Sequence, residues 1–183
     1  MTSGKEARAS VHELRKKLRE AAESGQLQLH RAPLRLHRPR IATMSEESGK
    51  SYAGGCLCGA LRYAADGAPL YAGYCYCADC RKASGSGYIP FMGFARAAVR
   101  FSGQTRTFTS KSAMGTDAVR NFCPVCGSLV FGGELGKSDE FTIYAGSLDD
   151  PSSFRPTVAI FTRNSPIWAV IPPSLRVFET TPA

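Results

Sequence analysis

Residues 121–128 read NFCPVCGS, in which Cys123 and Cys126 flank a Pro-Val pair and a glycine follows the second cysteine. A Cys-Pro-x-Cys-Gly turn is typical of a zinc knuckle, whose two sulfurs converge on one metal ion while backbone N–H groups point at the thiolates. Gly127 can adopt the left-handed conformation that closes such a loop. A tetrahedral zinc ion needs four ligands, so two more must come from elsewhere in the chain.

A second close pair of cysteines, Cys56 and Cys58, lies in the glycine-rich stretch GGCLCG at residues 54–59. Four thiolates from these two distant segments would make a closed structural zinc site. Such a site would join the start of a sheet to a hairpin far along the chain and contribute directly to folding.

The remaining three cysteines, Cys75, Cys77 and Cys80, lie within CYCADC at residues 75–80. Three protein ligands with a fourth position open to water or substrate are typical of a catalytic zinc, and soft thiolates favour Zn²⁺ over Mg²⁺ or Ca²⁺. Two other interpretations remain: Cys75 and Cys77 are buried apolar residues, or the three cysteines form a reversible disulfide and one free thiol.

Cysteines must be interpreted with the compartment in mind. The 183 residues are 43% hydrophobic and 10% aromatic, which predicts one domain with a substantial core. We find neither the apolar run of a signal peptide nor a stretch of about 20 apolar residues that would span a membrane. We therefore expect a reducing cytoplasm, where clustered cysteines are more often metal ligands or catalytic groups than disulfides.

The net charge of +8 is distributed unevenly. Residues 1–43 hold ten Lys or Arg and four Glu, a net charge of +6. Residues 44–183 hold thirteen Lys or Arg and eleven Asp or Glu, a net charge of +2. All three histidines lie in the first segment. Any metal site in residues 44–183 must therefore be built from cysteine, carboxylate or water.

The first 43 residues are predicted to be a basic N-terminal arm. Residues 10–25 indicate a short amphipathic helix that begins at a capping box of Ser10 and Glu13, and residues 26–43 are an Arg-rich, Pro-broken linker. We expect the arm to be dispensable and residues 44–183 to form a zinc-binding β domain.

From residue 52 onward, short apolar stretches alternate with Gly, Pro and Ser, which predicts a mainly β single domain of short antiparallel strands. One short turn of helix is expected at residues 78–85. The strands are expected at residues 60–65, 88–94, 99–103, 105–110, 118–122, 128–133, 141–147, 158–162 and 175–180.

The ordered set GGCLCGALRY (54–63), CYCADCRKASGS (75–86), FCPVCGS (122–128) and AGSLDDPSSFRP (145–156) resembles the glutathione-dependent formaldehyde-activating enzymes. This family also includes the centromere protein V type, and the resemblance covers about residues 52–180. Two features depart from the family pattern: Tyr76 stands where members often carry histidine, and residues 157–168 lack another frequent histidine. The resemblance implies a β-tent fold, a structural zinc on Cys56, Cys58, Cys123 and Cys126, and a catalytic zinc on Cys75, Cys77 and Cys80.

The resemblance also implies a carbon–sulfur lyase that forms or breaks S-hydroxymethylglutathione, or a related adduct of a small thiol and an aldehyde. Zinc would lower the pKa of the glutathione thiol, and the resulting thiolate would attack the aldehyde. Lys or Arg side chains would bind the glutathione carboxylates. Each candidate side chain can also be interpreted as an ordinary solvated surface charge. The candidates are Arg81, Lys82, Arg120 and Arg163.

Two residues near these motifs have simpler interpretations. Asp79 is expected to form a turn rather than to act as an acid or base, and Trp168 is expected to pack in the core or on a sheet rather than to bind a ligand.

Two other functions remain open. The chain could be a non-catalytic, zinc-stabilised binding module that uses its basic arm, or a thiol redox protein that uses Cys75, Cys77 and Cys80 without metal. The small net charge of residues 44–183 and the lack of interleaved aromatic residues in the arm argue against a nucleic-acid partner. No membrane partner is expected.

Overall fold

The computed structural model describes residues 16–17, 20 and 49–182. The chain divides into two units, Met1–Ile41 and Ala42–Ala183, and the fold described below is that of the second. Of the helix expected at residues 10–25, the structure describes residues 16, 17 and 20, which are helical and exposed. The rest of that helix and the linker lie outside the described residues.

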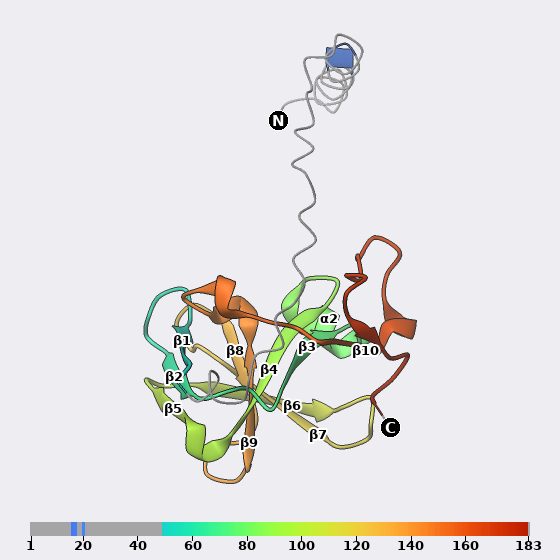
Figure 1. Ribbon diagram of the computed structural model, residues 1–183. Helices are drawn as coiled ribbons and strands as arrows, with labels where there is room; N and C mark the ends of the chain where they lie inside the picture. Colours follow the sequence, from blue (N-terminus) through green and yellow to red (C-terminus); the bar gives the residue numbers. More distant parts are fainter. Residues whose placement is uncertain (1–15, 18–19, 21–48, 183) are drawn as a thin grey trace, which may run out of the picture. The chain divides into compact units, whose positions relative to one another are not determined.

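The second unit is mainly β, with one short α-helix and several 3-10 turns within residues 49–182 (Figure 1). No helix in these residues is long and apolar enough to cross a membrane. The elements are β1 (Ser51–Gly55), β2 (Arg62–Asp66), β3 (Tyr71–Cys75), α2 (Ala78–Ser84), β4 (Ile89–Ala95), η1 (Arg96–Ala98), β5 (Val99–Ser102), β6 (Arg106–Lys111), β7 (Asp117–Phe122), β8 (Leu129–Gly132), β9 (Glu140–Tyr144), η2 (Ala145–Ser147), η3 (Pro151–Ser153), β10 (Val158–Ile160), η4 (Thr162–Asn164) and β11 (Arg176–Val177).

The strands form two sheets. The smaller has the order β1-β2-β5 and the larger has the order β11-β10-β3-β4-β9-β8-β7-β6. The expectation of antiparallel strands alone is wrong, because β10 runs parallel to both β3 and β11. A parallel pair cannot be joined by a tight hairpin. Here β4 to β9 lie between β3 and β10 in the chain, so the pairing is a long-range contact that a local pattern does not reveal.

Seven of the predicted strands and the short helix are confirmed, with shifted ends. The strand expected at 141–147 ends at Tyr144, where η2 begins, and the one expected at 175–180 is reduced to Arg176–Val177. The structure also contains β1 and β3, which the sequence did not predict. Both contain glycine and alanine, which are depleted in strands and weaken the signal.

The main core lies between the two sheets. Alternate residues of β4 and β9, such as Met92 and Ile143, face the small sheet and are almost fully buried. Phe101 of β5 stacks on Phe131 of β8, with ring centroids 4.0 Å apart, and meets Phe141 of β9 edge to face. Figure 1 shows β1, β2 and β5 beside the central strands β4, β8 and β9.

The other face of the large sheet is formed by the intervening residues of the same strands. The register pairs Cys75 with Ile89, Phe91 with Tyr144, and Thr142 with Gly132. Because side chains alternate between the faces of a strand, these residues point away from the main core. The large sheet thus separates the core from the surface on which the site is built.

Trp168 does not pack as expected. It is 67% exposed, in the segment between η4 and β11. Its ring lies against Gly87, where an added Cβ would come within 2.9 Å of a ring carbon.

Candidate metal centres

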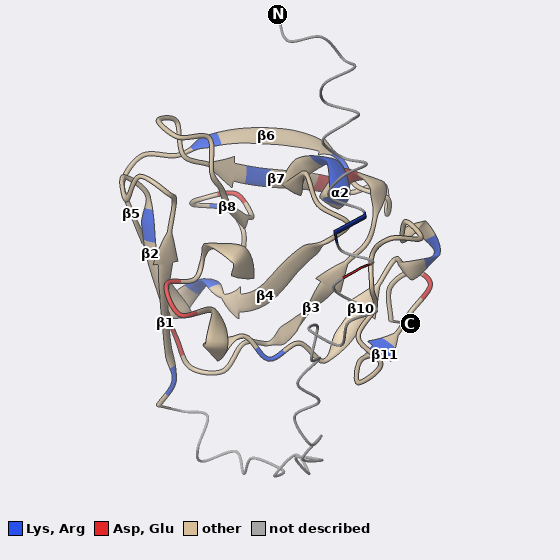
Figure 2. Ribbon diagram, turned by 90° about the horizontal axis from the view of Figure 1, so that it is seen from above, with Lys and Arg blue, Asp and Glu red and all other residues tan. Residues whose placement is uncertain are grey.

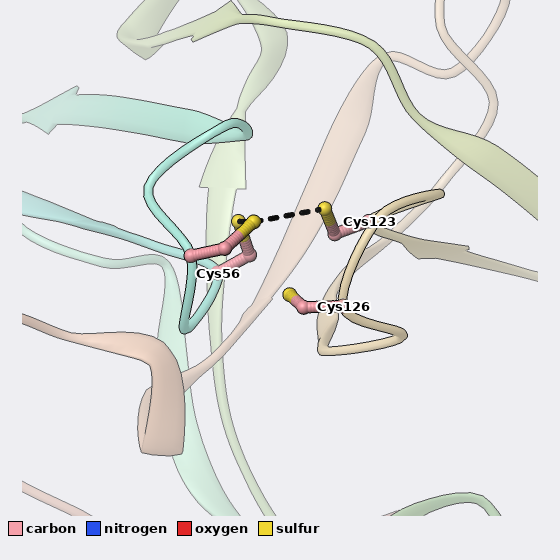
Figure 3. Close-up of side chains that lie close together, drawn as sticks. Cys56, Cys123 and Cys126 are labelled. Carbon is pink, nitrogen blue, oxygen red and sulfur yellow. Dashed lines mark hydrogen bonds between the residues drawn. The ribbon is translucent and has the colours of Figure 1, made fainter.

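The four-cysteine group consists of Cys56, Cys58, Cys123 and Cys126, whose sulfur atoms all lie within 4.8 Å of one another. The Cys56 and Cys58 sulfurs are 3.5 Å apart, and the Cys58 and Cys123 sulfurs are 3.7 Å apart. Four thiolates at about 2.3 Å from a tetrahedral zinc would be about 3.8 Å from each other. Figure 3 shows Cys56, Cys123 and Cys126 pointing toward a common point from two loops. The group therefore fits one zinc ion.

Backbone N–H groups support these sulfurs as the knuckle predicts. The N–H of Leu61 donates to the sulfur of Cys56 at 3.2 Å, and the N–H of Val125 donates to that of Cys123 at 3.4 Å. Gly127 has φ +73°, the left-handed conformation expected for it. Both loops are thus shaped to hold sulfur in its anionic, metal-binding form.

The hydroxyl of Ser128 connects the two loops. Its Oγ accepts a hydrogen bond from the N–H of Leu57 at 3.1 Å and lies 3.2 Å from the sulfur of Cys126. The bond from Leu57 uses a lone pair of this oxygen and not its hydrogen, so the hydroxyl can donate that hydrogen to the sulfur. This bond is the main reason that the pKa of Cys126 is lowered to about 5, which favours the thiolate.

Ser128→Ala should therefore weaken metal binding at this group without removing a ligand. Partners that orient metal ligands contribute a factor of about 10–100 in affinity, so we expect a loss of that size in competition with a zinc chelator. Ser86→Ala, at an exposed serine outside both cysteine groups, is the matched control. An unchanged zinc affinity in Ser128→Ala would show that the hydroxyl does not support the ligand.

The three-cysteine group consists of Cys75, Cys77 and Cys80, whose sulfurs also lie within 4.8 Å of one another. Cys75 is the last residue of β3, Cys77 is the N-cap of α2, and Cys80 lies in its first turns. The N–H of Cys80 donates to the sulfur of Cys77 at 3.3 Å. The strand end and the helix start thus bring three soft ligands to one point, which fits a metal with one further position for another ligand.

The thiols of this group strongly affect each other's protonation. Hydrogen bonds from Cys75 and Cys80 lower the pKa of Cys77. The pKa of Cys75 is raised, mainly by its hydrogen bonds with Cys77 and Cys80. At Cys80 the bond with Cys75 lowers the pKa, but the bond with Cys77 and burial outweigh it, so the pKa is raised. All seven cysteines are free thiols in this structure, so the disulfide that the redox interpretation allows among Cys75, Cys77 and Cys80 is not formed here.

The three-cysteine group opens onto a cavity of about 600 Å³ on the outer face of the large sheet. None of the other four cysteines lines it. The wall near the sulfurs is apolar, and Phe91, Val158 and Phe161 pack with Cys75 and Cys77 in one buried cluster. Asp79, in the first turn of α2, also lines the cavity.

Of the four candidate cations, the structure brings only Arg120 into this cavity. Its side chain is 7% exposed, and its guanidinium donates to the hydroxyl of Ser110 at 3.0 Å. Within residues 49–182 it forms no ion pair. Arg81 and Lys82 lie on α2 and Arg163 lies on η4, and none of the three lines the cavity.

Charged residues elsewhere are mixed in sign. Figure 2 shows Lys and Arg spread over many elements of the described domain and interspersed with Asp and Glu.

A family model described as glutathione-dependent formaldehyde-activating enzyme matches residues 51–164, more than half of the chain. The chain belongs to this family. No curated protein matches the chain. One solved structure, described as that of a Rhodobacter sphaeroides protein and Northeast Structural Genomics target, is 20% identical. It covers 55% of this chain and 93% of its own, with a TM-score of 0.41.

Family membership confirms the resemblance, and the structure explains one of its motifs. In residues 145–156, Asp149 forms a bidentate ion pair with Arg62 of β2. Asp150 caps η3, because its carboxylate accepts a hydrogen bond from the N–H of Ser152 at 2.9 Å. Leu148 bridges to Gly54 of β1. This motif therefore fixes the small sheet and does not line the cavity of the three-cysteine group.

Several cavity residues were not expected from the sequence, among them Ile89, Phe91, Thr142 and Tyr144. One signal could have indicated them. In residues 141–144, FTIY, the apolar Phe141 and Ile143 alternate with two hydroxyl-bearing residues, which indicates one face toward a core and the other toward a polar site.

Proposed function

We propose that this protein is a zinc-dependent carbon–sulfur lyase acting on an adduct of glutathione, or a related small thiol, with formaldehyde or a related aldehyde. The observation that carries the proposal is the cavity that joins three free sulfurs to a buried guanidinium. Its volume of about 600 Å³ lies within the usual range of small-molecule sites, about 300–1,000 Å³.

The two cysteine groups have different roles in this proposal. Cys56, Cys58, Cys123 and Cys126 hold a structural zinc, because four ligands leave no position for a substrate. Cys75, Cys77 and Cys80 hold a catalytic zinc, which supplies a positive charge that lowers the pKa of an incoming thiol. Zinc binding needs reduced thiols, so we place the protein in the cytoplasm.

The reaction makes or breaks one carbon–sulfur bond. In the forward direction the thiol sulfur adds to the aldehyde carbon, the carbonyl electron pair moves to oxygen, and the proton lost by the thiol ends on that oxygen. The apolar wall of Phe91, Val158 and Phe161 excludes water from the sulfur, and Arg120 binds a carboxylate of the thiol substrate.

The fold and domain organisation follow from the same assignment. We infer that the domain is of the β-tent type and that residues 44–183 form the zinc-binding unit. Both cysteine groups and the cavity lie within this segment, so the arm of residues 1–43 is not required for the reaction.

Arg120→Gln should weaken glutathione binding. A hydrogen bond to a charged group contributes about 1.5–3 kcal/mol, so the Kd should rise roughly tenfold to a hundredfold, as measured by calorimetry on the zinc-loaded full chain. Arg163→Gln, at an exposed cation outside the cavity, should leave the Kd unchanged. Equal affinities of the two variants would exclude Arg120 as the carboxylate-binding residue.

Exchange spectroscopy by NMR tests the proposed activity. The zinc-loaded full chain should accelerate interconversion of glutathione, formaldehyde and S-hydroxymethylglutathione, and a panel of larger aldehydes should identify the preferred substrate. Full zinc loading without acceleration for any aldehyde would contradict the proposal and favour the non-catalytic binding module.

A further inference from the structure

Tyr144 lies on the cavity face of the large sheet, on a strand between the strand of Cys75 and the strand of Arg120. The strand order is β3, β4, β9, β8, β7, with Cys75 on β3, Tyr144 on β9 and Arg120 on β7. Adjacent strands are about 4.8 Å apart, so Tyr144 lies about two strand spacings from each neighbour. All three residues line the same cavity.

The hydroxyl of Tyr144 reaches across β8 at a glycine. A Cβ added to Gly132 would lie 3.1 Å from the Tyr144 Oη, and Gly132 is the register partner of Arg120 on β7. The absence of a side chain at position 132 therefore leaves room for the phenol between β9 and Arg120.

This hydroxyl has no hydrogen-bond partner among the residues that the structure describes, unlike those of three other tyrosines. The hydroxyl of Tyr71 donates to Glu140 at 3.3 Å, and that of Tyr76 donates to the carbonyl of Val170 at 3.0 Å. Tyr63 lies 3.3 Å from the hydroxyl of Ser147. Tyr144 is half-buried and lines a substrate-sized cavity, so a bound ligand can supply the partner that a phenol usually finds.

Electrostatics make Tyr144 a donor and not a base. Burial raises its pKa above the ordinary value of 10.0, although the positive charge of Arg120 opposes the shift. The phenol therefore keeps its proton at neutral pH.

We propose that the Tyr144 hydroxyl donates a hydrogen bond to the oxygen on the aldehyde-derived carbon while the carbon–sulfur bond forms or breaks. This inference rests on the proposed function. In the forward direction the oxygen gains the carbonyl electron pair and then the proton released by the thiol, so Tyr144 stabilises developing negative charge and is not consumed. A fixed donor aimed at such an oxygen acts mainly on the transition state.

Tyr144→Phe removes only the hydroxyl, and loss of one such donor costs about a hundredfold in kcat or more. We therefore expect the exchange rate of the zinc-loaded full chain to fall by about that factor while the glutathione Kd stays within about twofold of the wild-type value. Tyr63→Phe is the matched control, because Tyr63 does not line the cavity and its hydroxyl lies beside that of Ser147; its kcat should be unchanged.

Gly132→Ala provides an independent test, because its new methyl group would crowd the Tyr144 Oη. It should lower kcat in the wild-type background and have little further effect in Tyr144→Phe. Full kcat in Tyr144→Phe, or a raised glutathione Kd with kcat retained, would overturn the inference and leave the proposed function standing. A wild-type protein that binds zinc but does not accelerate exchange would overturn both.

Discussion

Cys126→Ser should leave the chain largely unfolded or aggregated. The substitution replaces one of four converging thiolates with a hydroxyl that is a poor zinc ligand. Structural zinc binds with an apparent free energy of about 10–16 kcal/mol, as large as the whole stability of a typical domain, about 5–15 kcal/mol. Because the group joins the loop after β1 to the loop between β7 and β8, its loss should release both sheets.

Circular dichroism and metal analysis of the purified chain would measure this effect. Val125→Ser is the matched control, since Val125 lies in the same loop but is 74% exposed. It should keep the fold and the metal. A well-folded Cys126→Ser protein with the wild-type Tm would mean that these four cysteines do not share a structural metal ion.

Cys77→Ser should abolish activity and preserve the fold. The hydroxyl is a hard, poorly ionised ligand, and it replaces a thiolate at a group that has only three protein ligands. Zinc at Cys75, Cys77 and Cys80 should be lost, so the metal content should fall from two ions per chain to one. The exchange rate should fall at least a hundredfold.

The Tm is the control for this variant, because the four-cysteine group and the core between the sheets are unchanged. Retention of full activity in Cys77→Ser would contradict a catalytic role for the three cysteines. Loss of both activity and folding would instead assign them to the structure.

Much of the site could be predicted from the sequence because its ligands lie in short, local motifs. The spacing in NFCPVCGS and CYCADC limits how far apart the sulfurs can be, and the allocation of seven cysteines into groups of four and three matches the two clusters. The short helix after Cys77 was also predictable, because residues 78–85 end in a glycine that adopts the left-handed C-cap conformation.

The cavity could not be predicted in the same way, because it depends on which strands become neighbours. The parallel pairing of β10 with β3 brings Val158 opposite Gly73, and no local pattern encodes this contact. The choice among four cations has the same origin. Arg120 enters the cavity because it alternates with the buried Asn121 along β7, whereas the Arg81–Lys82 pair, next to the cysteines in sequence, lies on α2 outside the cavity.

The most direct test of the central claim is calorimetric titration of the zinc-loaded full chain with glutathione and with S-methylglutathione. If the three-cysteine zinc binds the substrate through its thiol, methylation should weaken binding at least tenfold, because a thioether cannot ionise to a thiolate. Equal affinity for the two ligands would contradict the claim that the open position of this zinc binds the substrate sulfur.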